Sequence, residues 1–215
     1  MESNKEDIVI LGFGGHAKSV ADCLLRNDAY HIAGYTDTHD CSNQFAYLGT
    51  DEELTSIYRK GIHKAVLGVG FLGKSIIRDR LVQTAKEAGF EFPVIIDPSA
   101  TIAKDVQIGE GTVVGKKAVI NAASTIGDFC IVNTGAIIEH ENVIDDYSHI
   151  SVGAILCGNV SVGHHTFIGA GSTVIQGRKI GNNCIIGANS TILSDVEDNM
   201  KYYGIVNNLG RLSEN

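Results

Sequence analysis

The sequence is poor in several features that each mark a common class of protein. It has 215 residues, of which 2 are Pro and none is Trp, and its 17 Lys and Arg stand against 25 Asp and Glu, a formal net charge of −8. A protein that binds nucleic acid normally presents an excess of Lys and Arg to the phosphates. The acidic balance therefore argues against nucleic acid as a partner.

Long apolar runs and paired cysteines are missing as well. No run approaches the ~18 apolar residues that would span a bilayer, and the first residues, MESNKED, lack the apolar core of a signal peptide. The five cysteines form no CxxC pair and no metal-ligand spacing: they are Cys23, Cys41, Cys130, Cys157 and Cys184. Scattered cysteines of this kind are typical of reduced thiols in the cytosol, so we expect a cytoplasmic protein without a membrane span.

Glycine, by contrast, is abundant. The chain contains 25 Gly, well above the usual share of ~7%. Hydrophobic residues make up 44% of the chain and charged residues 20%, which is enough apolar material to bury a core. A glycine excess without proline indicates many tight backbone turns.

Residues 1–93 alternate between strand and helix patterns. Apolar runs predict strands at 8–11, 32–35 and 64–70, and helical spacing predicts helices at 17–26, 52–60 and 73–88. A further strand is predicted at 94–96, directly after this region. The apolar faces of the two longer helices are predicted to be Val20, Ala21, Leu24 and Leu25 in one, and Ile76, Ile77, Leu81, Val82 and Ala85 in the other. This order implies a small parallel sheet with right-handed crossovers, an α/β N-terminal domain of Rossmann-like type.

From residue 94 onward the pattern has a period of six. Every sixth residue from Ile96 to Ile192 is Ile, Val or Leu, 17 positions without an insertion. The position four residues after each is small or β-branched in 15 of 17 cases, the exceptions being Asn142 and Arg178. Because self-similarity at a fixed period is the signature of a solenoid, residues 94–215 are predicted to form an all-β parallel β-helix.

Three hexapeptides close one triangular coil of 18 residues, so 17 of them give between five and six coils. The coils stack at about the ~4.8 Å spacing of paired strands. The aliphatic residue points into the prism, and the small residue, including Cys130 and Cys184, fills the space beside it. Turn residues lie at the corners, where side chains point outward.

A glycine-rich loop, GFGGHA at residues 12–17, follows the first predicted strand and opens the first predicted helix. Backbone N–H groups and the helix dipole make such a loop a cradle for anions. Asp37 ends the second predicted strand, where a carboxylate can meet a ribose hydroxyl. A plain tight turn is the alternative, and NAD would suit the same loop, but no second domain for hydride transfer follows. We therefore expect a nucleotide-sugar diphosphate.

His140 and Glu141 fall at a predicted corner of the prism. An imidazole titrates near neutral pH and can accept a proton from an attacking group, and a neighbouring carboxylate can orient the ring. Backbone N–H groups at the glycine-rich corners are candidate donors to an oxyanion. The alternative is that His140 and Glu141 are solvated surface. His164 and His165 lie at a different corner, and we interpret that pair as surface or subunit contact.

The hexapeptides, the opening GFGGHAK, the string NTGAIIEHE at 133–141 and the string SHISVG at 148–153 together resemble one family. It is the group of sialic acid O-acetyltransferases and bacillosamine-pathway N-acetyltransferases, which are left-handed β-helix acyltransferases. The resemblance extends from Ile8 to about Gly204. It implies a homotrimer that uses acetyl-CoA as cosubstrate, with each active site between neighbouring prisms, and it implies no metal.

The same resemblance assigns roles to individual residues. His140 would be the general base and Glu141 its partner. The positions that contact acetyl-CoA are His149, Ala170 and Ala188, and those that hold the nucleotide sugar are Gly14, Gly15, His16, Asp37, Thr38 and Gly70. Two positions depart from the family pattern. Thr38 stands where a second Asp is usual, and Gly204–Asn208 reads GIVNN in place of a Gly-Val-Pro-Ala-Lys-like segment beside the CoA tail.

These residues predict direct transfer of acetyl from acetyl-CoA to the amine of a nucleotide-linked sugar of the UDP-4-amino-4,6-dideoxy type. O-acetylation of sialic acid or a related nonulosonate is the close alternative, because a hydroxyl acceptor needs the same base. A lyase like the γ-class carbonic anhydrases would need three histidines around Zn²⁺, but His140, His149 and His165 do not repeat at the coil period. A non-catalytic trimeric scaffold that holds a nucleotide remains a third alternative.

Overall fold

A computed structural model describes residues 5–41, 44–73 and 76–206, and their contacts group them into two compact units. The first unit contains the described residues of 5–70 and 76–98, and the second contains 71–73 and 99–206. The division into a domain of residues 1–93 and a domain of residues 94–215 stays a prediction. The two units are described separately.

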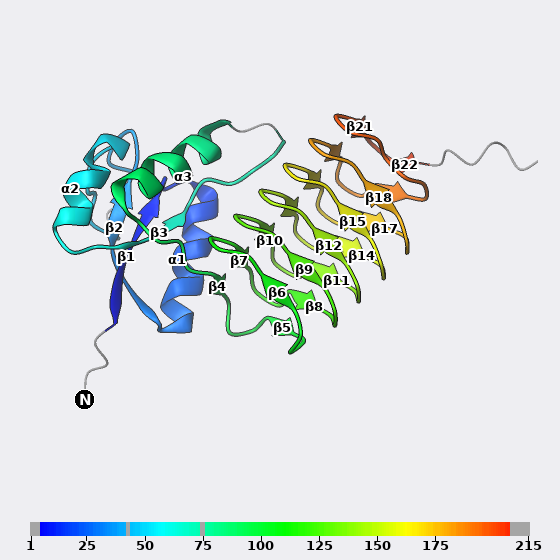
Figure 1. Ribbon diagram of the computed structural model, residues 1–215, viewed down its shortest axis with the longest axis horizontal. Helices are drawn as coiled ribbons and strands as arrows, with labels where there is room; N and C mark the ends of the chain where they lie inside the picture. The colour runs from blue at the N-terminus through cyan, green and yellow to red at the C-terminus, as the bar shows by residue number, and fades with distance from the viewer. Residues whose placement is uncertain (1–4, 42–43, 74–75, 207–215) are drawn as a thin grey trace, which may run out of the picture. The chain divides into compact units, whose positions relative to one another are not determined.

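The first unit is a three-stranded parallel sheet with helices packed on it (Figure 1). Its strands are β1 (Glu6–Leu11), β2 (Tyr30–Thr36) and β3 (Lys64–Leu67), in the order β2-β1-β3. The other elements are α1 (Gly15–Asn27), the 3-10 helix η1 (Asp51–Glu53), α2 (Leu54–Arg59), α3 (Ile76–Ala88) and β4 (Ile95–Ile96). Helix α1 packs on β2, while α3 packs on β3 and α2. The predicted parallel α/β organisation is confirmed.

The core of this unit centres on β1, whose residues Ile8 to Leu11 are fully buried, as expected for a central strand covered on both faces. Three residues of the predicted apolar helix faces are not buried. Leu25 of α1 is largely exposed, and Ile76 and Ile77 are 83% and 55% exposed. Apolar spacing identifies one side of a helix, but it does not say over what length another element covers that side. In α3 the first buried residue is Arg78, the third residue of the helix.

The second unit is the predicted β-helix, whose coils lie one on another from β5 to β22 (Figure 1). One face consists of β7 (Val113–Val114), β10 (Ile131–Val132), β13 (His149–Ile150), β16 (Phe167–Ile168), β19 (Ile185–Ile186) and β21 (Lys201–Tyr202). The second face consists of β5 (Thr101–Ile102), β8 (Val119–Ile120), β11 (Ile137–Ile138), β14 (Ile155–Leu156), β17 (Thr173–Val174), β20 (Thr191–Ile192) and β22 (Ile205–Val206). The third consists of β6 (Gln107–Ile108), β9 (Thr125–Ile126), β12 (Val143–Ile144), β15 (Ser161–Val162) and β18 (Lys179–Ile180).

The aliphatic column predicted from the sequence fills the interior of the prism. Its members from Val114 to Ile192 are all buried, and those from Val114 to Val174 each pair with the residue 18 positions further on, as Val132 pairs with Ile150. The register shortens in the last coil, where Ile180 pairs with Val196 and Thr191 pairs with Ile205. Val196 therefore takes an aliphatic place, and its predicted place in the small column is wrong.

The small column contributes hydrogen bonds as well as volume. The hydroxyl of each Ser or Thr in one set donates to a carbonyl 15 residues later, over 2.7 to 2.9 Å. Each of these oxygens also accepts a backbone N–H from the residue 18 positions later. The set is Thr112, Ser124, Ser148, Thr166 and Ser172. Cys130 and Cys184 are fully buried in the same column, as predicted, and burial raises the pKa of the Cys184 thiol.

The corners are three columns of two-residue turns. Corner 1 comprises residues 104–105, 122–123, 140–141, 158–159 and 176–177; corner 2 comprises 110–111, 128–129, 146–147, 164–165 and 182–183; corner 3 comprises 116–117, 134–135, 152–153, 170–171 and 188–189. From residue 111 onward the second residue of every turn has a positive φ, a region that favours glycine, and many are nevertheless not glycine. Main-chain hydrogen bonds between successive coils hold most of these turns, whereas the N–H groups of Lys117 and Ala123 donate to the side chains of Ser99 and Asp105.

Candidate active site

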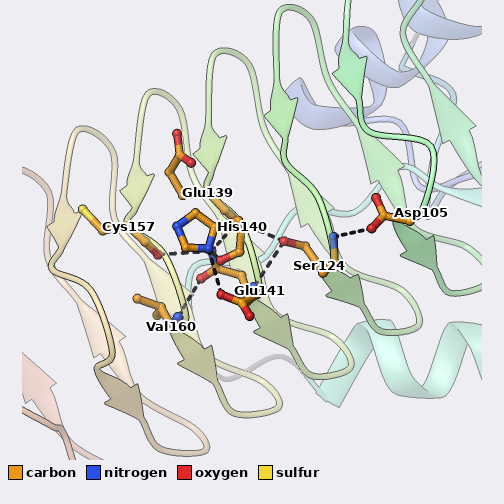
Figure 2. Close-up of polar contacts among 9 residues, drawn as sticks. Asp105, Ser124, Glu139, His140, Glu141, Cys157 and Val160 are labelled. Carbon is orange, nitrogen blue, oxygen red and sulfur yellow. Dashed lines mark hydrogen bonds and ion pairs between the residues drawn. The ribbon is translucent and has the colours of Figure 1, made fainter.

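His140 and Glu141 form one turn of corner 1, with their side chains next to each other on the outside of the prism (Figure 2). The φ of Glu141 is 59°, and its N–H donates to the carbonyl of Ala122 over 2.9 Å. His140 Nδ1 lies 2.9 Å from Glu141 Oε2. Because an ionised carboxylate only accepts, Nδ1 carries a proton, and in the neutral imidazole Nε2 is then the nitrogen with the lone pair. The two side chains are 59% and 63% exposed, so Nε2 is accessible.

The imidazole of His140 lies over Gly158, which occupies the same place on the next coil. A Cβ added to Gly158 would stand 2.5 Å from both Cε1 and Nε2 of His140. Gly158 does not have a positive φ, so the ring, rather than the backbone, requires a glycine here. Sequence reasoning missed this residue, although a comparison at a spacing of 18 would have placed it beneath His140.

His149 lies on the face between corners 2 and 3, in β13, and is only 5% exposed. Its Nδ1–H donates to the carbonyl of Phe71 over 2.6 Å, and Asn133 Nδ2 lies 3.1 Å from its Nε2. The N–H of Thr134 donates to Asn133 Oδ1, which directs the amide nitrogen of Asn133 toward the ring. Asn133 and Phe71 thus fix the orientation of His149, and neither was singled out from the sequence.

Ala170 and Ala188 occupy corner 3 on successive coils, where short side chains leave the surface open. The coils approach closely there, because a Cβ on Gly169 would stand 2.6 Å from the nitrogen of Ala188. His140, His149 and the two alanines are therefore on different edges of one prism, and a single chain does not bring them together. The segment Gly204–Asn208 departs from the family pattern and is described only as far as Val206. Its described residues continue the β-helix through β22, and 207–208 lie outside the described residues.

In the first unit the glycine loop and Asp37 are in contact. β1 and β2 are neighbours, so the loop after β1 meets Asp37 just beyond the end of β2. The N–H of Phe13 donates to Asp37 Oδ2 over 2.7 Å, and the N–H of Thr38 donates to Oδ1 over 2.7 Å. Gly14 is the N-cap of α1, and a Cβ on Gly14 or Gly15 would meet nothing within 4 Å. The loop is thus open on the side where backbone approaches an anion.

Asp37 is ionised at neutral pH. Partial burial by itself would raise the pKa of this carboxyl group. Hydrogen bonds from the N–H groups of Phe13 and Thr38 and from the Thr38 hydroxyl outweigh the burial and hold the pKa below its ordinary value. The carboxylate therefore anchors the glycine loop and keeps lone pairs for a further donor.

Thr38, Gly70 and His16 are the remaining residues predicted to hold the nucleotide sugar. A Cβ on Gly70 would stand 3.4 Å from the Cβ of His16, so the two residues are neighbours. Thr38 forms part of an open cavity of about 510 Å³, which is lined by Thr38, Thr50, Asp51, Glu52, Arg80, Leu81 and Thr84. No sequence motif joins these residues, because they come from three separate stretches of chain.

Metal sites and membrane spans were searched for within residues 5–41, 44–73 and 76–206. That part of the chain contains no group of three His, Cys, Asp or Glu side chains that could hold a metal ion. None of its helices combines the length and the apolar character needed to cross a membrane. His140, His149 and His165 lie on corner 1, an intervening face and corner 2, so they do not converge within one chain.

Comparison with known proteins gives the class to which this fold and site belong. Residues 7–85 match the PglD N-terminal domain, and residues 159–194 match the bacterial transferase hexapeptide of six repeats. The two matches fall on the two predicted parts of the chain, and the predicted fold class, an N-terminal Rossmann-like domain followed by a hexapeptide β-helix, is confirmed.

Solved structures of high similarity narrow the class. A histidine variant of GDP-perosamine N-acetyl transferase from Caulobacter crescentus, in complex with CoA and GDP-perosamine, is 32% identical with a TM-score of 0.87, covering 92% of this chain and 93% of that one. The acetyltransferase domain of PglB from Neisseria gonorrhoeae FA1090, in complex with acetyl coenzyme A, is 33% identical with a TM-score of 0.87, covering 94% and 97%.

A curated relative is the UDP-N-acetylbacillosamine N-acetyltransferase of Bacillus subtilis (strain 168), 33% identical over 113 residues. The match spans 51% of this chain and about half, 51%, of that relative. The chain belongs to the family of sugar acetyltransferases that the sequence resembles, a family of acetyl-CoA-dependent enzymes.

Proposed function

We propose that the protein transfers an acetyl group from acetyl-CoA to the amine of a nucleotide-linked amino sugar, with His140 as the general base. The observation that carries this proposal is the His140–Glu141 pair. Glu141 accepts the Nδ1–H over 2.9 Å, which leaves Nε2 as an exposed base at a corner of the prism. The similar proteins are named as N-acetyltransferases of bacillosamine and perosamine nucleotides.

The reaction requires an unprotonated amine, a stabilised oxyanion and aligned reactants. As the amine nitrogen attacks the thioester carbonyl, Nε2 of His140 accepts its proton, and Glu141 stabilises the resulting imidazolium. The tetrahedral intermediate collapses by breaking the C–S bond, and the imidazolium returns the proton to the departing thiolate. The products are the N-acetylated sugar and CoA. Backbone N–H groups at the corners are the candidate donors to the oxyanion.

A nucleotide-linked acceptor is favoured by the first unit. Its glycine loop is open to an anion, Asp37 is ionised beside it, and Thr38, the residue after Asp37, borders an open cavity. We propose that Gly14, Gly15, His16, Asp37, Thr38 and Gly70 hold the nucleotide sugar, of the UDP-4-amino-4,6-dideoxy type. O-acetylation of sialic acid or a related nonulosonate would use the same base, but it gives the glycine loop no phosphate to bind.

We also propose a homotrimer in which the active site lies between two prisms. His140 occupies corner 1, whereas His149, Ala170 and Ala188, proposed to contact acetyl-CoA, lie on another face and on corner 3. A site that combines these residues therefore needs a second copy of the chain. The five cysteines form no disulfide with one another, which supports a cytoplasmic location.

The test measures release of free CoA thiol from acetyl-CoA with UDP-linked and GDP-linked 4-amino sugars and with sialic acid. Turnover on a nucleotide sugar that is lost in His140→Ala supports the acceptor and the base together. Turnover on sialic acid alone overturns the acceptor in favour of O-acetylation. Turnover that survives His140→Ala overturns the base, and nucleotide binding without CoA binding would favour a scaffold. Light scattering of the purified protein tests the trimer.

A further inference from the structure

Asn142 is the residue of the small column that differs most from its neighbours inside the prism. It follows the His140–Glu141 turn directly, at a position where the other coils mostly carry Ala, Ser, Thr, Cys or Val. Its side chain is fully buried. A buried carboxamide costs free energy unless its N–H and C=O groups are hydrogen-bonded, so the partners of Asn142 indicate what the residue does.

Two of its hydrogen bonds reproduce what a serine or threonine makes in this column. Asn142 Nδ2 donates to the carbonyl of Cys157, 15 residues later, over 3.1 Å. Asn142 Oδ1 accepts the N–H of Val160, 18 residues later, over 3.1 Å. Figure 2 shows both partners on the coil beyond His140. A hydroxyl group would be sufficient for this link between coils.

The remaining contacts of Asn142 point back to its own turn. Nδ2 lies 2.6 Å from the carbonyl oxygen of Glu139 and 3.4 Å from that of His140. The first distance is that of a full hydrogen bond, and the second is a longer contact. The Ser and Thr members of the column bond to neighbouring coils, and one of them, Ser124, also donates to the Glu139 carbonyl, over 2.9 Å. Asn142 adds a bond to this carbonyl and a contact with the next one from within the coil of the turn itself.

We propose that Asn142 is a positioning residue, whose amide fixes the peptide groups of Glu139 and His140 and thereby the direction in which His140 presents Nε2. The direction of a side chain follows from the backbone that carries it, and a displacement of about 1 Å at a reacting group costs ~100-fold in rate in sensitive cases. This inference rests on the proposed function of His140 as the base.

The test variant is Asn142→Ser, because serine can keep both bonds to the next coil and loses the bond to Glu139. We expect kcat to fall ~tenfold, the rate equivalent of one lost hydrogen bond, with the KM for acetyl-CoA unchanged. In a His140→Ala background the same substitution should change the residual rate less than twofold. A merely structural role would lower the rate equally in both backgrounds, and that result would overturn the proposal.

Thr166→Ala provides the matched control. Thr166 follows the His164–His165 turn as Asn142 follows His140–Glu141, and it bonds to Gly181 and Cys184 of the next coil. This variant should lower the melting temperature and leave kcat within twofold of wild type. An equal loss of kcat in Thr166→Ala and Asn142→Ser would mean that any weakened coil slows the enzyme.

A second readout does not require turnover. In nitrogen-15 NMR of the histidine rings, wild type should show His140 as the Nδ1–H tautomer, and folded Asn142→Ser should show a mixture of tautomers. If the wild-type protein turns over no acceptor, the proposed function fails, but the NMR measurement still tests the positioning role of Asn142. A tautomer of His140 that is unchanged in Asn142→Ser would overturn that role. Asn142→Thr serves in the same way if the serine variant does not fold.

Discussion

Two corners of the same prism each carry a two-residue turn that begins with a histidine, yet only one of the two turns has the features of an active site. His140–Glu141 and His164–His165 both have a second residue with positive φ, 59° and 54°. At corner 1 the partner of the imidazole is a carboxylate, and at corner 2 it is another imidazole, with the two Nδ1 atoms 3.1 Å apart. The fold of the turn is therefore not what distinguishes them.

The neighbours on the adjacent coils make the difference. Beneath His140 lies Gly158, which leaves space for the ring. Beside His164 lies Asn182, whose Oδ1 accepts the His164 N–H over 3.0 Å. His165 stacks on Tyr147, which stacks on Phe129, with ring centroids 4.9 and 5.1 Å apart. The side chains of corner 2 thus contact one another from coil to coil, whereas the imidazole of His140 at corner 1 stays largely exposed.

The largest expected effect is the difference in kcat between two variants, each of which lacks the first histidine of one corner. His140→Ala should lower kcat by ~100-fold to 10,000-fold, the usual contribution of a general base, while His164→Ala should leave it within about twofold. Steady-state thiol release on the acceptor that wild type uses measures both. Equal losses in the two variants would erase the distinction between the corners.

Next in size is the change that fills the space under the ring. Gly158→Ala should lower kcat by ~tenfold or more, because its Cβ would stand 2.5 Å from the His140 ring and force the ring aside. The backbone there accepts alanine, so the melting temperature should change little. The control is the same substitution in His140→Ala, where no ring remains to be moved and the residual rate should stay the same.

A smaller effect is expected from the partner of the base. Glu141→Gln keeps an oxygen that can accept the Nδ1–H but removes the charge that stabilises the imidazolium, so kcat should fall about tenfold. His165→Gln is the equivalent change at corner 2 and should have no effect on the rate. If Glu141→Gln were as active as wild type, the charge of the Glu141 carboxylate would contribute nothing to the rate, and His140 would act without it.

The smallest effect belongs to corner 2 and depends on pH. The backbone N–H and the side-chain amide of Asn182 donate hydrogen bonds to Asp198, which hold the pKa of its carboxyl group below the ordinary value. A carboxyl group whose pKa is lowered by folding stabilises the folded state above its unfolded pKa, and this stabilisation is lost as the pH falls through the folded value.

Asp198→Ala should therefore melt slightly lower than wild type at pH 7, by no more than ~2 °C, and the gap should close in acid below the ordinary pKa of ~4. Differential scanning calorimetry across this range measures the gap. A gap that persists unchanged in acid would show that the charge of Asp198 contributes nothing. Turnover should be unaffected at neutral pH.

The β-helix could be predicted almost residue by residue, because its interior is one repeated contact. Each aliphatic residue meets its equivalent on the next coil, so the period itself gives the register. The prediction failed at Val196, where a shorter turn changes the spacing and no sequence rule gives a turn its length. In the first unit, exposed Ile76 and Ile77 show that apolar spacing alone does not reveal what covers a helix.

The candidate site was only partly accessible from the sequence. His140 and Glu141 were found because adjacent residues in a two-residue turn share one corner. Asn142 was noticed as an exception to a column, but its bond to Glu139 depends on the path of the chain through the turn. Gly158 and Phe71 lie 18 and 78 residues from the histidines that they support, and only the folded chain makes them neighbours.

The positive φ at successive corners has a consequence for how such enzymes diversify. Phe129, Glu141, Tyr147 and Asn159 all adopt this conformation on coils of the same prism. Because main-chain bonds hold these turns, a corner accepts very different side chains while the interior stays unchanged. The interior residues that determine the fold can therefore stay the same while the corner residues that determine the chemistry change. A lineage can acquire a new reactive pair by replacing two adjacent residues, with little risk to the ability of the chain to fold.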